Sequence, residues 1–175
     1  TLAVGIDMGI LKLAVCSDGQ VIEPVNSYKK HLRRLSLAQH RLDRKVSPNR
    51  TTGQKASKNW KKQLKKVQRL HKKMADTRRD YLHKATHMLA LKHRLVVLED
   101  IKVGNLSASP KGTVDKPGKQ VKQKAGLNKA ILDQGWYEFR RQLAYKEKWL
   151  GGEVRVVSPP YTSQRCYQCG HTEGN

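Results

Sequence analysis

The feature that most restricts the fold is one long basic segment, residues 29–94, in which apolar residues recur at helical spacing. The segment holds 22 lysines and arginines against 3 acidic residues. A turn-rich joint at 47–53 divides it, and each side shows the three-to-four-residue period of an amphipathic helix. The periodic positions are Leu32, Leu35, Leu42 and Val46, then Trp60, Leu64, Val67, His71, Met74, Tyr81, Ala85 and Met88. The pattern predicts an antiparallel pair of helices, with Ser57 or Asn59 as the cap of the second.

The charge of the whole chain indicates what it binds. A formal net charge of +22 over 175 residues repels itself unless a polyanion neutralises it, so nucleic acid is the predicted partner. No apolar run approaches the roughly 20 residues of a membrane span, and Thr1 precedes no signal-peptide-like segment. These features favour a cytosolic protein without a membrane partner. Both ends look cut, so we expect a segment of a longer protein.

Short apolar runs predict a β-sheet around the basic segment. We expect three hairpin-linked strands at 2–8, 11–17 and 20–22, a buried central strand at 94–99 and a fifth strand at 153–157. One amphipathic helix is predicted at 127–150, and residues 102–126 look like a long basic loop, either functional or a solvated linker. This order predicts an α/β fold of the ribonuclease H type, with a mixed five-stranded sheet.

Two carboxylates end apolar strands of this predicted sheet. Asp7 and Glu99 are costly to desolvate unless they face a cleft and meet a cation. If the first and fourth strands are parallel neighbours, both side chains reach the same end of the sheet and could bind Mg²⁺, in a two-metal site for phosphoryl chemistry. Asp7 could instead cap a turn. Asp100 is adjacent to Glu99, and strand alternation sends one of the two to the metal side; we favour Glu99.

The cysteines indicate metal chemistry rather than disulfides. Cys166 and Cys169 form a C-x-x-C pair that supplies half of a zinc site, with His171 as a possible third ligand, whereas Cys16 stands alone. A solvent-exposed pair that binds no metal is the alternative. Four other histidines have no matching spacing: His71, His83, His87 and His93.

Cations of the second predicted helix are the candidates for nucleic-acid contacts. They are Lys61, Lys62, Lys65, Lys66, Arg69, Lys72, Lys73, Arg78 and Arg79. Charged helix faces are usually only solvated, but this segment is far more basic than that norm. Four aromatic residues could stack on bases, although at helical spacing they are more often core: Trp60, Trp136, Tyr137 and Trp149.

Four ordered motifs together resemble the TnpB (OrfB) family of transposon-encoded, RNA-guided DNA endonucleases, which are related to type V CRISPR effectors. They are GIDMG at 5–9, VLEDI at 97–101, QGWYEFRRQL at 134–143 and PYTSQRCYQCGH at 160–171. The resemblance implies a RuvC-like domain in which Asp7 and Glu99 are the first and second metal-binding carboxylates. It also implies a guide RNA, a target DNA and a bacterial or archaeal cytosol, with Arg140 and Arg141 as candidates for contacts to the nucleic-acid backbone.

The resemblance also sets the expected domain boundaries. RuvC-like parts are expected at 1–28 and 95–160, the inserted basic hairpin at 29–94 and the first half of a zinc ribbon, with a structural Zn²⁺, at 161–175. The family's third catalytic aspartate and its N-terminal region are absent from this sequence, so this segment alone is expected to cleave poorly. Two alternatives stay open: a nuclease-inactive, RNA-guided transcriptional repressor of the same family, and a general RNA-binding structural protein.

Overall fold

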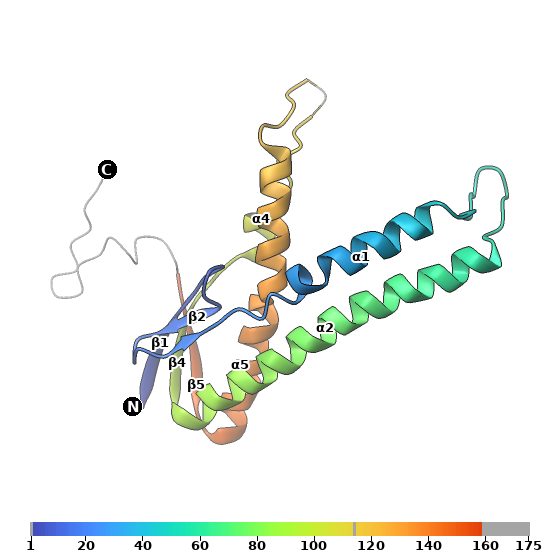
Figure 1. Cartoon of the computed structure of the whole chain (residues 1–175). Helices are drawn as coiled ribbons and strands as arrows, with labels where there is room; N and C mark the ends of the chain where they lie inside the picture. The colour runs from blue at the N-terminus through green and yellow to red at the C-terminus, as the bar shows by residue number, and fades with distance from the viewer. Residues whose placement is uncertain (1, 114, 159–175) are drawn as a thin grey trace. The chain divides into compact units, whose positions relative to one another are not determined.

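Figure 1 shows a computed structural model of the chain, which describes residues 2–113 and 115–158. In chain order its elements are β1 (Ala3–Met8), β2 (Ala14–Cys16), β3 (Val21–Ile22), α1 (Ser27–Asp43), α2 (Lys58–Lys92), β4 (Leu95–Glu99), α3 (Val103–Leu106), α4 (Val121–Gln134), α5 (Trp136–Leu150) and β5 (Glu153–Val157). Residues Val25–Tyr81 form one compact unit, and the segments before and after them form the other.

The sheet has the predicted mixed topology. Its strand order is β3-β2-β1-β4-β5, in which β1, β2 and β3 pair antiparallel while β4 pairs parallel with β1 and with β5. The prediction that the first and fourth strands are parallel neighbours is therefore confirmed. The second strand is shorter than predicted because residues 11–13 belong to the bend before β2, and the third begins at Val21 rather than at Gln20.

Alternation along the strands places the core of this unit on one face of the sheet. Val4, Ile6 and Met8 are buried, whereas the residues between them are exposed or half-buried. Residues of β4, α5 and the end of α2 are buried with them: Val96, Leu98, Phe139, Leu143, Leu82 and Leu89. Polar contacts join the last turns of α2 to α5, since the Lys146 ammonium donates to the Thr86 hydroxyl over 2.8 Å.

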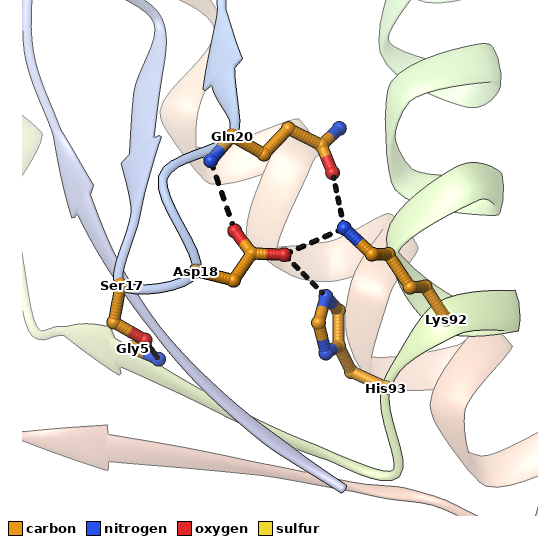
Figure 2. Close-up of polar contacts among 6 residues, drawn as sticks. All are labelled: Gly5, Ser17, Asp18, Gln20, Lys92 and His93. Atoms are coloured by element: carbon orange, nitrogen blue, oxygen red, sulfur yellow. Dashed lines mark hydrogen bonds and ion pairs between the residues drawn. The ribbon is translucent and has the colours of Figure 1, made fainter. Parts of the chain in front are cut away.

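A side-chain cluster fastens the turn between β2 and β3 to the end of α2 (Figure 2). The Asp18 carboxylate accepts a 2.6 Å hydrogen bond from the Lys92 ammonium and a 3.0 Å hydrogen bond from the backbone N–H of Gln20. These donors hold the pKa of Asp18 below its ordinary value. Nearby, the Ser17 hydroxyl accepts a 3.0 Å hydrogen bond from the Gly5 amide of β1. The cluster therefore ties the antiparallel hairpins to the helix that leads into β4.

The unit Val25–Tyr81 contains α1 and the first part of α2, whereas the predicted hairpin covers 29–94, so the last turns of α2 belong to the other unit. Its core joins α1 to the first part of α2 through Leu35, Ala38, Val67 and Met74. The Ser57 hydroxyl accepts a 3.1 Å hydrogen bond from the Trp60 amide, which confirms Ser57 as the N-terminal cap of α2.

Four of the periodic positions are exposed rather than buried, among them His71. Leu32 is 44% exposed and Met88 is 54% exposed, although both lie on helices. Val46 is 53% exposed because α1 already ends at Asp43. Apolar residues at these places extend the helical period without a neighbouring surface to pack against.

The predicted helix at 127–150 is two helices, and the predicted loop before it is partly helical. Gly135, at φ 72°, ends α4 and precedes α5. A positive φ breaks the helix, and glycine adopts it at little steric cost. The region 102–126 contains α3 and the first turns of α4, so the prediction of a structureless loop there was wrong.

Candidate functional site

The pairing of β1 with β4 brings the two strand-end carboxylates together. The last pair of the parallel ladder is Ile6 opposite Leu98, and the next residue on each strand is Asp7 and Glu99. Both lie on the sheet face opposite the buried residues, with Asp7 exposed and Glu99 half-buried. The two acidic residues predicted from the sequence therefore lie on neighbouring strands at the carboxyl end of the sheet.

Two hollows adjoin these carboxylates. One, of about 650 Å³, is lined by Glu99 and Asp100 together with the loop after β4. The other, of about 460 Å³, is lined by Asp7 and the loop after β1. Met8 and Trp136 line both hollows, so the first residue of α5 lies beside both carboxylate positions.

Asp100 has a partner of its own. The Arg140 guanidinium of α5 donates to its carboxylate over 2.7 Å, and both side chains are partly exposed. Arg140 is a candidate for contacts to a nucleic-acid backbone, and in the structure its guanidinium pairs with Asp100. Arg141 is likewise engaged, since its guanidinium forms two 2.8 Å hydrogen bonds with the Glu138 carboxylate.

The donor set at the carboxyl end of the sheet suits a hard cation. Carboxylate oxygens are ligands that Mg²⁺ prefers, and a hollow beside each residue leaves room for water and a phosphate. Within residues 2–113 and 115–158 no group of three or more histidine, cysteine or acidic side chains could hold a metal ion. Asp7 and Glu99 would thus be a partial ligand set. The predicted zinc ligands Cys166 and Cys169 lie outside the described residues.

A basic groove runs between α1 and α2 in the other unit. It has a volume of about 430 Å³, and its lining includes the apolar residues Leu37, Ala38 and Leu70 and no acidic residue. The Gln63 amide, buried in its wall, donates a 2.9 Å hydrogen bond to the Ala38 carbonyl and so fixes α2 to α1. The cations that line the groove are Arg34, Arg41, Lys66, Arg69 and Lys73.

Three of these cations were predicted from the sequence, and two were missed. Arg34 and Arg41 lie on α1, seven residues apart and therefore on one helix face, a spacing that could have revealed them. Of the other predicted cations, Lys61, Lys62 and Lys65 are exposed outside the groove, and Arg78 is half-buried. Lys72 and Arg79 form exposed ion pairs with Asp76.

The four candidate stacking aromatics fall into different environments. Trp136 is 5% exposed, which confirms the core interpretation for that residue. Tyr137 and Trp149 are 74% and 77% exposed, so the core interpretation is wrong for them. Trp60 is half-buried at the start of α2. The exposed pair lies on the face of α5 that the sheet does not cover.

Comparison with known proteins decides the family. Residues 1–109 match the sequence profile of the IS605 OrfB family, described as "Probable transposase". The chain belongs to the TnpB (OrfB) family. Residues 136–175 of this TnpB-family chain also match the profile of the Cas12f1-like TNB domain.

Two named relatives support the same family assignment. The chain is 55% identical over 169 residues to "Putative RNA-guided DNA endonuclease InsQ" of Escherichia coli K12, which covers 97% of this chain and 40% of that protein. It is 36% identical over 175 residues to a protein of Streptomyces pristinaespiralis with the same type of name, covering 99% of this chain and 38% of the relative. The TnpB-family chain thus spans about two fifths of the relatives' length.

Solved structures share the fold. A Cas12f1 in complex with sgRNA and target DNA superposes with a TM-score of 0.55 at 19% identity, over 97% of this chain and 39% of that one. A CRISPR-Cas12f ternary complex gives a TM-score of 0.54 at 21% identity, over 96% and 30%. At such identities the likeness concerns the fold. Among the described residues, every helix is too short or too polar to cross a membrane.

Proposed function

We propose that this TnpB-family chain contributes the first two metal-binding carboxylates, Asp7 and Glu99, to the RuvC-like site of an RNA-guided DNA endonuclease. The observation that supports this is the parallel pairing of β1 with β4, which sets the two acidic residues side by side. The names of the bacterial relatives supply the class of activity. Guide RNA and target DNA are the proposed partners, as in the complexes that share the fold.

Mg²⁺ would be held by Asp7 and Glu99 and would supply an activated water and charge stabilisation for phosphodiester hydrolysis. Other residues of the chain position the metal ligands and limit the negative charge beside them. The two ladders of β4 fix the backbone at Glu99, because this strand is paired with β1 on one side and β5 on the other. Arg140 neutralises Asp100, which keeps a third negative charge from opposing the phosphate that approaches Glu99.

The basic groove is proposed as the surface that holds nucleic-acid backbone. Five cations and three apolar side chains in one lining suit the phosphates and sugars of a nucleic-acid strand. Sequence choice would then fall to base pairing with the guide, which needs no base-reading side chain from the protein. Structural Zn²⁺ at Cys166 and Cys169 belongs to the same proposal.

The test is guided cleavage by the intact protein with its RNA, a target plasmid and Mg²⁺. Asp7→Asn is expected to lower cleavage at least about 100-fold while guided binding to the target remains, because one carboxylate of the metal site is lost. Asp76→Asn is the matched control, since it makes the same change of charge on an exposed ion pair of α2. Cleavage by Asp7→Asn at the rate of this control would refute the proposed site.

The repressor alternative makes a different prediction. The unmodified protein would then bind its guided target without cutting it, with or without Mg²⁺. The placement of Asp7 beside Glu99 favours the nuclease, because two carboxylates on adjacent strands supply oxygen ligands to one divalent cation. A general RNA-binding protein would bind without regard to guide sequence, and Asp7 would not affect its affinity for divalent ions.

A further inference from the structure

A stripe of three aromatic side chains and one arginine runs along α5, exposed at both ends and half-buried at Tyr145. Tyr137, Arg141, Tyr145 and Trp149 recur every four residues, a spacing that keeps them on neighbouring positions of one helix face. The stripe spans about 18 Å, since twelve residues of helix rise about 1.5 Å each. Tyr137 and Trp149 at its ends are 74% and 77% exposed.

Three of the four side chains of the stripe, Arg141, Tyr145 and Trp149, are in contact. The rings of Tyr145 and Trp149 meet edge to face, with centroids 4.7 Å apart and planes at 64°. The guanidinium of Arg141 lies 5.6 Å from the centre of the Tyr145 ring. The Tyr145 hydroxyl lies 3.4 Å from the Nδ1 atom of His83 on α2, which limits rotation of the ring. The central part of the stripe is thus held in place before any partner binds.

Packing of α5 does not explain these aromatics. The helix buries its other face, through Trp136, Phe139 and Leu143, against the sheet side of the unit. An exposed tryptophan beside a tyrosine leaves a large apolar surface in water, which is unfavourable unless a partner covers it. Flat π-faces with polar edges suit unpaired nucleobases, which stack on them regardless of sequence.

Charge on the stripe is largely cancelled. Glu138 forms a forked pair with Arg141, and those hydrogen bonds lower the pKa of Glu138 to about 2, so the acid stays ionised at neutral pH. Arg141 is therefore not a free phosphate-binding cation. Any nucleic acid on this face would be held by stacking, whereas the basic groove of the hairpin would hold phosphates.

We propose that the stripe Tyr137–Arg141–Tyr145–Trp149 is a stacking track for the unpaired bases of a single DNA strand on its way to the carboxylates. This assignment rests on the proposed endonuclease function. Tyr137 directly follows Trp136, which lines both hollows beside Asp7 and Glu99, so the Tyr137 end of the stripe is the end nearer the candidate site. In the proposed function the strand cleaved at those carboxylates is DNA, so we take the strand that stacks on the stripe to be DNA rather than RNA.

The experiment measures binding of short oligonucleotides to the purified 175-residue chain without Mg²⁺. The probes are a fluorescent dT12, a 12-mer with abasic sites at every position, and rU12. Variants are Trp149→Leu, which keeps an apolar side chain but removes the stacking ring, and Trp149→Phe, which keeps an aromatic ring. Trp149 is 77% exposed, so both should fold, and circular dichroism verifies it.

Trp149→Leu is expected to weaken dT12 binding about 5- to 100-fold, the effect of losing one stacked base, while Trp149→Phe stays within about threefold of the unchanged chain. The affinity for the abasic probe should be the same for Trp149→Leu and Trp149→Phe. The salt dependence of dT12 binding should keep its slope, because no phosphate contact is removed.

Three results would overturn the track: equal dT12 affinity for Trp149→Leu and the unchanged chain, an equal loss with the abasic probe, or a larger Trp149 effect with rU12 than with dT12. These results are independent of cleavage. If Asp7→Asn kept full cleavage while Trp149→Leu lost dT12 binding, the endonuclease site would be refuted and base stacking on α5 would stand.

Discussion

Glu147 of α5 carries a carboxylate that is fully buried and, among the described residues, accepts no hydrogen bond. It lies close to Gly152, where a β-carbon would overlap its Oε2 atom and lie 2.8 Å from the Arg94 carbonyl. Burial raises the pKa of Glu147, and the positive charge of Arg94 offsets only part of that rise. The folded chain therefore keeps the proton on this acid to a higher pH than the unfolded chain does.

A raised carboxyl pKa makes stability fall as pH rises. Between the unfolded value near 4.5 and the higher folded value, the folded state binds more protons, so the free energy of unfolding decreases through that window and stays lower above it. Glu147→Gln removes the ionisation and keeps the shape. We expect it to raise the free energy of unfolding at pH 7.5 by about 1–2 kcal/mol, the scale of an unsatisfied buried polar group, and to change it little near pH 4.

Urea unfolding at both pH values measures this effect. The control is Glu153→Gln, which removes an exposed acid whose pKa a hydrogen bond from Arg155 lowers. That change should slightly reduce stability at pH 7.5 instead. A Glu147→Gln variant that is no more stable than the unchanged chain at pH 7.5 would contradict the burial argument.

At the scale of elements, the break between α4 and α5 depends on Gly135. Its φ of 72° is the left-handed region, where a β-carbon costs roughly 1–2 kcal/mol. Gly135→Ala is therefore expected to lower the free energy of unfolding by about that amount, measured by thermal or urea denaturation. The break also sets where Trp136 begins α5, so this variant should alter the hollows beside Asp7 and Glu99.

Gly126 is the matched control for that substitution. It lies inside α4 with helical backbone, and an added β-carbon would meet nothing within 4 Å. Gly126→Ala should therefore stabilise the helix by about 0.5–1 kcal/mol. Destabilisation by both changes to a similar degree would mean that the backbone angle of Gly135 is not the cause.

The elements also show what the sequence can predict. Alternation and apolar runs predicted β1, β4 and β5, and the order of elements predicted the parallel pairing that sets Asp7 beside Glu99. The two-helix break was missed because apolar residues keep their period across Gly135, and a lone glycine inside such a pattern does not reveal its φ.

Contacts between distant segments could not be predicted in the same way. The pairing of Arg140 with Asp100 joins residues 40 positions apart, and the groove combines cations of α1 with those of α2. Local periodicity carries no information on which faces of two elements meet. The exposure of Tyr137 and Trp149 was missed for that reason, since helical spacing alone suggests burial.

For the molecule as a whole, the net charge of +22 controls both stability and binding. Most of it lies on the hairpin, where exposed lysines and arginines repel one another. Phosphates that bind there release counterions, so the affinity for any nucleic acid should fall steeply as salt increases. What distinguishes the groove from the rest of this basic surface is that five cations and three apolar side chains line one hollow.

Charge-reversal variants at matched positions distinguish RNA binding in the groove from general electrostatic attraction to the basic surface. Arg41→Glu with Arg69→Glu removes two groove cations, and Lys61→Glu with Lys65→Glu makes the same charge change on exposed positions outside it. Binding of a 20-nucleotide RNA to the purified chain is measured from 50 to 300 mM NaCl. We expect the groove pair to reduce the slope of log affinity against log salt by about 1.4, roughly 0.7 for each lost phosphate contact on a single strand. The double variant Lys61→Glu with Lys65→Glu changes the long-range field equally but loses no close contact, so it should leave the slope nearly unchanged. Equal slopes for the two double variants would mean that RNA binds over the whole basic surface and that the groove has no special role.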